Sequence, residues 1–364
     1  MLNIGFQFFS DAGTLVNATG NYVNAYTGTT TAFDTTNKLT PTMKTFYDTQ
    51  LLENARPELI FAQLAKKQAL PRNHGKSVEW RKWNTLPEAE TLTEGVIPTG
   101  QKLGMSSMTQ DIVQKGLYVT ISDQLELHAI DNAILGATEE LGASGGMSVD
   151  KMVRNEVVGG TVKQLCDKVN ATTGVHTEVT TRSGMDTTSV LTPTEINKAV
   201  TTLKKMHAPT INGKYVAVIH PSVAYDLRQS KEWIEAHKYA ATTEMFNGEI
   251  GELHGVRFIE STNQKIWNDS TCPVKTAAGN EGTPPATYYS VYATLVMGKD
   301  AFAMIDPDGG NMEMIVKTKD EAGGPLNQFS TVGYKYEGAA KILYEDRMVR
   351  IESLSAYSAT DTAN

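Results

Sequence analysis

The feature that most constrains the fold of this chain is a long connection, from Asn84 to about Thr109, between two stretches that alternate apolar and polar residues. Val78 and Trp80 belong to the first stretch and residues 117–121 form the second, and both are predicted to be strands. The connection contains several helix and strand breakers, namely Pro87, Gly95, Pro98, Gly100 and Gly104. Long loops without secondary structure of their own are uncommon in compact domains and are usually functional or interacting. The sequence therefore predicts a long hairpin that projects from the body.

Seven residues of this hairpin are predicted to contact a neighbouring protein molecule: Trp80, Arg81, Trp83, Glu88, Glu90, Glu94 and Lys102. Tryptophan and arginine are enriched at protein interfaces. Stacking of the tryptophans on nucleic-acid bases is a competing interpretation, but the patch is small and the glutamates that follow it would repel phosphate. Packing of each tryptophan within its own hairpin remains an alternative.

The composition limits the classes of protein to which this chain can belong. Its 364 residues are 40% hydrophobic and 20% charged, which is enough to bury a core in about two to three compact units or in one elongated subunit with projections. The formal net charge of −8 argues against a protein that mainly coats nucleic acid. Two cysteines exclude a disulfide framework and a cysteine-rich zinc site, and they favour a reducing compartment. No apolar run approaches the ~20 residues of a membrane span, and no signal peptide is expected.

The N-terminal region is predicted to hold an arm followed by helices. Residues 1–40 are rich in Thr, Asn, Gly and Tyr and lack periodicity. They are interpreted as an extended arm that orders only against another surface, with a disordered tail as the alternative. From Thr42 to about Pro71 apolar residues recur at helical spacing, and Pro57 is expected to begin a second helix.

A long helical element is predicted after Ser122, followed by an α/β region at about 190–300 and a β-rich region at 328–354. Capping boxes are expected at the starts of two helices, formed by Asp123 with Glu126 and by Thr192 with Glu195. The glycine-rich stretch 142–146 is predicted to interrupt the long helix, which then resumes with Leu165 and Cys166 on its apolar stripe. Three strands are predicted in the α/β region, at 215–219, 256–259 and 290–296.

Three stretches resemble catalytic or ligand-binding motifs, but the residues around each of them do not meet the requirements of the motif. Gly75-Lys76-Ser77 lacks the earlier glycine that a phosphate-binding loop requires. Residues 142–146 match G-x-S-x-G but follow a helical stretch, whereas the nucleophile elbow follows a strand. Residues 306–311 lack the ligand pattern of a calcium loop. No histidine or cysteine stands in a metal-binding or nucleophile–base arrangement. No catalytic, cofactor-binding or metal-ligating residue is therefore predicted.

Several stretches resemble a known family: Thr40–Tyr47 with Leu51–Pro57, Gly75–Trp83, and Val332–Lys335 with Gly338–Ala340. Together with the order of arm, hairpin, long helix, α/β region and final β region, they make the chain resemble the major capsid proteins of tailed bacteriophages, which share the Johnson (HK-ninety-seven-like) fold. Among them the chain resembles the family typified by phage N-four, and the resemblance covers roughly 38–354.

The resemblance implies an α+β fold with five parts. These are an N-terminal arm and helices at 1–73, an extended loop at 74–121, a peripheral domain with spine helix and loop at 122–189, an axial domain at 190–300, and a return to the peripheral β region and C-terminus at 301–364.

The resemblance also implies a non-catalytic role as the subunit of an icosahedral shell around double-stranded DNA. Many copies would form pentamers and hexamers, assembled in the cytoplasm of a bacterial host and found in the virion. Scaffold, portal and decoration proteins are further expected partners, DNA would be contacted weakly at the inner surface, and no membrane or cofactor is expected. The alternatives are a tail or decoration protein and an α/β hydrolase-like enzyme.

Some members of this fold join a lysine of the extended loop covalently to an asparagine of a neighbour. Such chemistry requires a neutral, desolvated amine. Lys102 is the only lysine of the loop tip, lies between Gly100 and Gly104, and has no apolar cluster beside it in the sequence. A shell without covalent links between subunits is therefore predicted.

Overall fold

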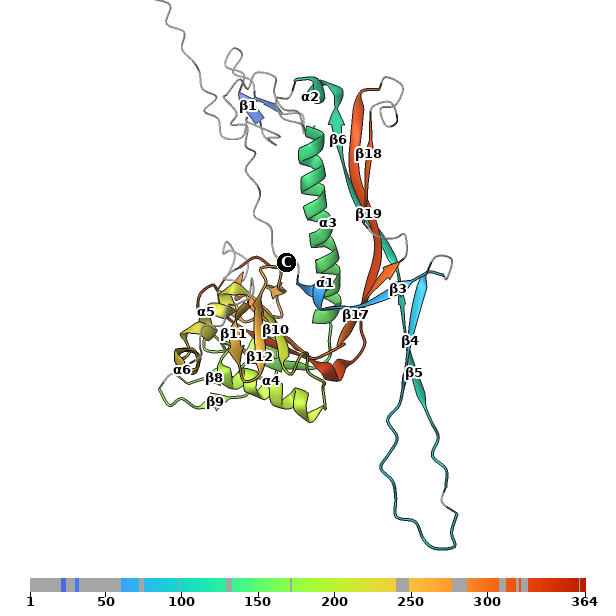
Figure 1. Cartoon of the computed structure of the whole chain (residues 1–364). Helices are drawn as coiled ribbons and strands as arrows, with labels where there is room; N and C mark the ends of the chain where they lie inside the picture. The colour runs from blue at the N-terminus through green and yellow to red at the C-terminus, as the bar shows by residue number, and fades with distance from the viewer. Residues whose placement is uncertain are drawn as a thin grey trace, which may run out of the picture. The chain divides into compact units, whose positions relative to one another are not determined.

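The computed structural model (Figure 1) describes residues 21–23, 30–32, 60–71, 75–97, 99–128, 133–170, 172–239, 249–276, 287–307, 312–318, 321, 327–359 and 361–364. The predicted arm and the helices before Ile60 lie outside these residues, apart from an antiparallel pair, β1 (Asn21–Val23) and β2 (Thr30–Ala32).

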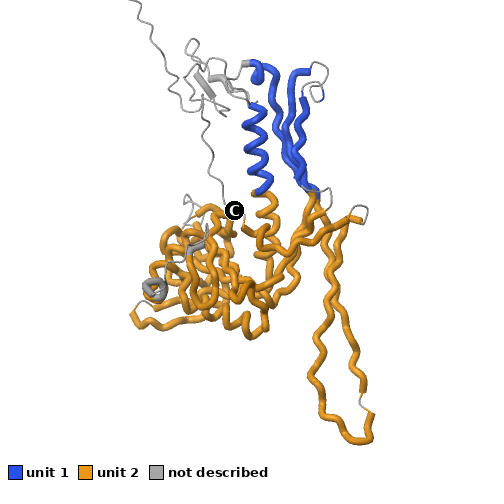
Figure 2. Tube along the Cα trace, viewed as in Figure 1, with its two compact units in different colours: residues 1–56, 114–146, 312–336 blue, residues 57–113, 147–311, 337–364 orange. Residues whose placement is uncertain are grey.

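The chain divides into two compact units (Figure 2). The first contains residues 1–56, 114–146 and 312–336, and the second contains residues 57–113, 147–311 and 337–364. The long helix α3 (Ala133–Val158) and the long strand β19 (Phe329–Ile342) each contribute residues to both.

The second unit is built on one mixed sheet with the strand order β11-β12-β10-β16-β20-β7, and β13 also pairs with β16. The strands are β7 (Lys163–Leu165), β10 (Tyr215–Ile219), β11 (Glu249–Leu253), β12 (Val256–Glu260), β13 (Ile266–Trp267), β16 (Val291–Met297) and β20 (Met348–Ser353). Every residue of β10 and β16 is buried, as expected for central strands with continuous apolar sequence. The three strands predicted in the α/β region are confirmed within one or two residues.

Helices cover both faces of this sheet. They are α1 (Phe61–Leu64), α4 (Pro193–Lys205), α5 (Pro221–Gln229), α6 (Lys231–Tyr239) and the second half of α3. Ala217 and Ile219 of β10 belong to a buried cluster with α4 and α5. The alternate residues Val216 and Val218 belong to a second cluster with α1 and α3. Because side chains alternate across a strand, β10 joins two hydrophobic cores.

A second group of strands in this unit joins distant parts of the chain. β17 (Phe302–Pro307) pairs antiparallel with β19 from Phe302 opposite Ile342, and parallel with β3 (Lys66–Leu70). The prediction of helix up to about Pro71 is therefore wrong beyond Leu64, where α1 ends. The residues that follow form β3. Pairing with β17 determines the conformation of β3, and the local sequence carries no sign of so distant a partner.

The predicted hairpin exists, but its second strand is not the predicted one. β4 (Ser77–Trp83) pairs with β5 (Met105–Asp111), from Ser77 opposite Asp111 to Trp83 opposite Met105. The connection predicted from Asn84 to about Thr109 is therefore shorter and covers 84–104, because β5 begins at Met105. The stretch 117–121 belongs instead to β6 (Val113–Ser122), which pairs with β19. The alternation at 117–121 correctly predicts a strand, but the predicted pairing of this strand with the stretch around Val78 and Trp80 is wrong.

In the first unit, β6 and β18 (Glu313–Lys317) both pair with β19. A side chain at Gly116 would lie 2.7 Å from the carbonyl oxygen of Tyr334, and one at Gly333 would lie 2.7 Å from Cβ of Tyr118. The close approach of these backbones therefore requires glycine at both positions. Helix α2 (Asp123–His128) begins where predicted, but Ser122 Oγ, rather than Asp123, accepts the capping bond from the amide of Leu125.

Helix α3 runs without a break over 26 residues, so the predicted interruption at 142–146 is wrong. A Cβ at Gly145 would lie 2.7 Å from Sδ of Met312, and Ser144 Oγ lies 3.4 Å from the hydroxyl of Tyr334. At least Gly145 therefore serves close packing rather than a hinge. Among the described residues, no helix combines the length and apolar character needed to cross a membrane.

The helix α3 ends at Val158, so Leu165 and Cys166 do not lie on it as predicted. Leu165 ends β7, and the amide of Cys166 donates to the carbonyl of Glu352 in the neighbouring chain segment. Cys166 is fully buried, and this burial, helped by the charge of Glu195, raises the pKa of its thiol well above the usual value. Cys166 is therefore an uncharged side chain packed in the hydrophobic core.

Candidate assembly interface

The connection between β4 and β5 exposes apolar and acidic side chains together. Its large apolar residues are all more than half exposed: Leu86, Leu92, Val96, Ile97 and Leu103. Glu88, Glu90, Glu94 and Lys102 are also exposed, and none of them forms an ion pair within the part of the chain that the structure describes. We call residues 84–97 and 99–104 the acidic tip. Exposed apolar groups beside polar ones are typical of surfaces that bind a partner.

The two tryptophans of β4 have different environments because alternate residues face opposite sides of the strand. Trp80 packs against a buried cluster of Ile112, Ile305 and Ala339 within its own chain. Trp83 is 64% exposed. Trp80 therefore packs within its own chain, which is the alternative that the sequence left open. Trp83 is the better candidate for a contact with a neighbour.

Arg81 forms an ion pair on the exposed side of the strand. Its guanidinium lies 3.2 Å from the carboxylate of Glu79, and this hydrogen bond and charge hold the pKa of Glu79 below its usual value. Both side chains are well exposed, so the pair adds little to subunit stability.

A cavity of about 400 Å³ opens at the base of the acidic tip. Three segments line it, 81–83 with Thr85, Met206 with His207, and Tyr344 with Asp346 and Arg347. We call it the basic pocket, because Arg81, Lys82 and Arg347 outnumber its one carboxylate. The sequence prediction identified only Arg81 and Trp83 of this set, since the other segments lie far away in the chain and match no motif.

Two cations of the basic pocket share one aromatic ring. The guanidinium carbon of Arg347 lies 3.6 Å from the ring centroid of Tyr344, and Nζ of Lys82 lies 5.1 Å from the same centroid. Arg347 also donates to the carbonyl oxygen of Lys299 at 3.1 Å. Neither Lys82 nor Arg347 pairs with a carboxylate among the described residues. The pocket therefore presents ordered but unneutralised positive charge.

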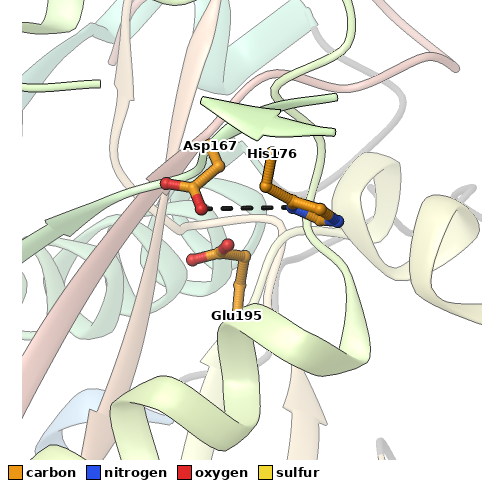
Figure 3. Close-up of side chains that lie close together, drawn as sticks. All are labelled: Asp167, His176 and Glu195. Atoms are coloured by element: carbon orange, nitrogen blue, oxygen red, sulfur yellow. Dashed lines mark ion pairs between the residues drawn. The ribbon is translucent and has the colours of Figure 1, made fainter. Parts of the chain in front are cut away.

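Asp167, His176 and Glu195 bring three potential metal-ligand atoms together (Figure 3). The ammonium of Lys198 already lies 2.5 Å from Asp167 Oδ2 and 2.9 Å from Glu195 Oε1, whereas Nδ1 of His176 is 4.0 Å from Asp167. Burial alone would lower the pKa of Lys198, but its hydrogen bonds to Asp167 and Glu195 and their charges raise it. A charged lysine competes for the oxygens that a metal would need, so the cluster is best explained as an ion-pair network.

The same network replaces the predicted capping box of α4. Helix α4 begins at Pro193 as predicted, but Thr192 makes no side-chain capping bond. The carboxylate of Glu195 accepts instead from Gln164 Nε2 at 2.6 Å and from Lys198. The network therefore ties α4 to the segment that carries β7.

A buried carboxylate is held beside β7 as well. Glu352 of β20 is 1% exposed. Nε of Arg182 donates to it at 2.7 Å and Nε of Arg350 at 3.0 Å. Trp267 lies under both guanidinium groups, 4.0 Å from Arg182 and 5.7 Å from Arg350. Burial would lower the pKa of Arg182, but the hydrogen bond and charge of Glu352 outweigh it and raise the pKa.

Comparison with known proteins gives one family. The sequence profile of the phage capsid protein family matches residues 107–350. No curated protein sequence matches the chain.

Solved structures with the same fold come from several phages. The capsid of cyanophage P-SCSP1u has a TM-score of 0.61 at 14% sequence identity, covering 86% of this chain and 94% of that chain. The capsid of Ralstonia phage GP4 has a TM-score of 0.61 at 12% identity, covering 89% and 98%. The head of Helicobacter pylori bacteriophage KHP40 has a TM-score of 0.58 at 10% identity, covering 86% and 96%. At these identities the similarity concerns the fold, a mixed arrangement of helices and sheets.

Proposed function

We propose that this chain, which belongs to the phage capsid protein family, is the major subunit that closes an icosahedral head around double-stranded DNA. The observation that carries the proposal is the acidic tip, a segment whose large apolar side chains are all more than half exposed in the described part of a single copy. Burial of such a segment requires a neighbour, and a shell supplies one to every copy.

The finer division into capsid parts belongs to the same proposal. Residues 1–73 are the N-terminal arm with its helices and 74–121 the extended loop. Residues 122–189, with α3 as the spine helix, and 301–364 form the peripheral domain, and 190–300 form the axial domain. The last assignment is supported by α4, α5, β10, β12 and β16, which share one buried cluster, although β20 and β7 complete their sheet.

The role is structural and non-catalytic, and the partners are other copies in pentamers and hexamers. Scaffold, portal and decoration proteins are the expected accessory partners, and the net charge of −8 favours weak contact with packaged DNA. Assembly takes place in the bacterial cytoplasm, and the product is the virion.

Expression of the full chain in bacteria, followed by sedimentation and negative-stain electron microscopy, tests this function. We expect closed shells or isolated pentamers and hexamers. Tubes or stacked rings would favour a tail protein. A chain that stays monomeric at every concentration and with a co-expressed scaffold would contradict the proposal.

A further inference from the structure

We propose that the basic pocket binds the acidic tip of a second copy of this chain, with Glu88, Glu90 and Glu94 facing Lys82 and Arg347, the two pocket cations that pair with no carboxylate among the described residues. The inference rests on the proposed function, because it requires copies that meet in an assembly. It adds the chemistry of one contact between them.

The charges of the two surfaces are complementary. The acidic tip has three glutamates and one lysine, all exposed and without ion pairs among the described residues. The basic pocket has three cations, of which Arg81 already pairs with Glu79, and one aspartate. Glu88 and Glu90 are two positions apart and both are exposed, so they are close enough in the chain to reach neighbouring cations in one contact. Two carboxylates this close in the chain can meet two neighbouring cations at once, and charge-assisted pairs of this kind are stronger than neutral hydrogen bonds.

The apolar groups of the two surfaces are complementary as well. Leu86 and Leu92, which flank the first two glutamates, are 51% and 73% exposed. The pocket contains Trp83, Met206 and Tyr344 beside its cations, and Trp83 and Met206 are exposed in the single copy. A segment that carries both leucine and glutamate can cover these side chains and neutralise the cations in one contact.

A DNA phosphate backbone is the main rival occupant of the pocket. Phosphate would neutralise Lys82 and Arg347 but would leave Trp83 and Met206 uncovered. The acidic tip satisfies the charged and the apolar groups together, and each copy in a shell has one tip and one pocket. The observations therefore favour a second copy over nucleic acid.

A charge-swap experiment in the full chain tests the pairing. One variant carries Glu88→Lys, Glu90→Lys and Glu94→Lys, a second carries Lys82→Glu and Arg347→Glu, and a third combines all five changes. We expect each reversed surface alone to raise the concentration needed for assembly by about ten-fold or more, and the combined variant to recover most of this loss. Exposed charges outside both surfaces supply matched controls, Lys205→Glu beside the pocket and Glu178→Lys far from the tip in sequence.

The possible outcomes are distinguishable. If both reversed variants assemble like the unaltered chain, or the combined variant assembles no better than either, the pairing is wrong. If the pocket variant assembles normally but packages less DNA, phosphate is the occupant and the proposal fails. Failure of the unaltered chain to assemble would instead contradict the proposed function. The thermal melting of each unassembled subunit shows whether a variant is folded.

Cross-linking gives a second measurement that does not depend on charge reversal. A photoreactive amino acid replaces Glu90, and these chains are assembled with ¹⁵N-labelled unaltered chains. We expect cross-links from position 90 of one copy to residues 81–85 or 344–347 of a labelled copy. Cross-links confined to other segments would overturn the proposal.

Discussion

The layered sheet of the second unit and the hairpin β4–β5 belong to the same compact unit but are stabilised in different ways. The sheet strand β16 is buried along its whole length, with helices on both faces of its sheet. The strand β4 alternates exposed with half-buried residues and leads into the exposed acidic tip. The sheet therefore gains its stability within one copy, whereas the acidic tip and the exposed face of β4, which includes Trp83 but not Trp80, can be stabilised mainly by a neighbour. Changes in the two regions should consequently appear in different measurements.

The largest expected effect is the loss of a core aromatic residue. Phe258 on β12 is fully buried and lies edge-on to Trp233, with the ring centroids 5.6 Å apart. Phe258→Ala should lower the free energy of unfolding of the isolated subunit by about 3–5 kcal/mol, measured by denaturant titration. Leu92→Ala in the acidic tip is the control, and we expect a change within about 0.5 kcal/mol. If both variants lost the same free energy of unfolding, the sheet and the acidic tip would contribute equally to the stability of the lone subunit, and the proposed difference would be wrong.

Two ion pairs, one buried in the sheet and one exposed on the hairpin, test the same difference between the regions. Glu352→Ala leaves Arg182 and Arg350 without their buried carboxylate and should cost about 3 kcal/mol in the free energy of unfolding. Glu79→Ala removes the partner of Arg81 on the exposed face of the hairpin, and we expect no measurable change in subunit stability. The same denaturant titration serves both variants. A destabilised Glu79→Ala subunit would show that the hairpin contributes more to the lone copy than its exposure suggests.

The tryptophans of β4 separate folding from assembly. Trp83→Ala should leave the subunit as stable as before but weaken the shell, by about 2 kcal/mol for each contact, because its ring is exposed in one copy. Trp80→Ala should instead lower the melting temperature of the subunit, since its ring packs on the cluster around Ile305. Calorimetry of subunits and of assembled shells measures both effects. An unchanged shell after Trp83→Ala would place this residue outside the interface.

The buried parts of the molecule were the most predictable from sequence. Strands such as β10 and β16 are continuous apolar runs, and α4 has a clear helical period after Pro193, so local residues specify them. β5 reads Met-Ser-Ser-Met-Thr-Gln-Asp, with little apolar alternation because neither face of the hairpin is deeply buried. The sequence of β5 alone therefore does not predict a strand, and its conformation depends on its pairing with β4.

The candidate interface was predictable only in part. The acidic tip could be recognised because its breakers, glutamates and apolar residues are contiguous in sequence. The basic pocket combines residues 81–85 with 206–207 and 344–347, and only the folded chain brings these segments together. The continuity of α3 through 142–146 was missed for a related reason, since the partner that makes Gly145 necessary is Met312 on a distant segment.

The smallest expected effect is at Lys102, which tests whether the hairpin is held to its neighbour without covalent bonds. A lysine that attacks an amide must first lose its proton, which burial promotes and water opposes. Lys102 is exposed in the acidic tip, and the two free cysteines are both buried, so neither offers another route to a link between subunits. Particles boiled in SDS with and without reductant should give one band near 39.7 kDa, and Lys102→Ala should not change it. Bands of dimers, pentamers or hexamers that disappear in Lys102→Ala would contradict this expectation and would identify Lys102 as the linking residue. A single band would instead mean that shell stability is the sum of many contacts, each weak alone and held together because every subunit touches several neighbours.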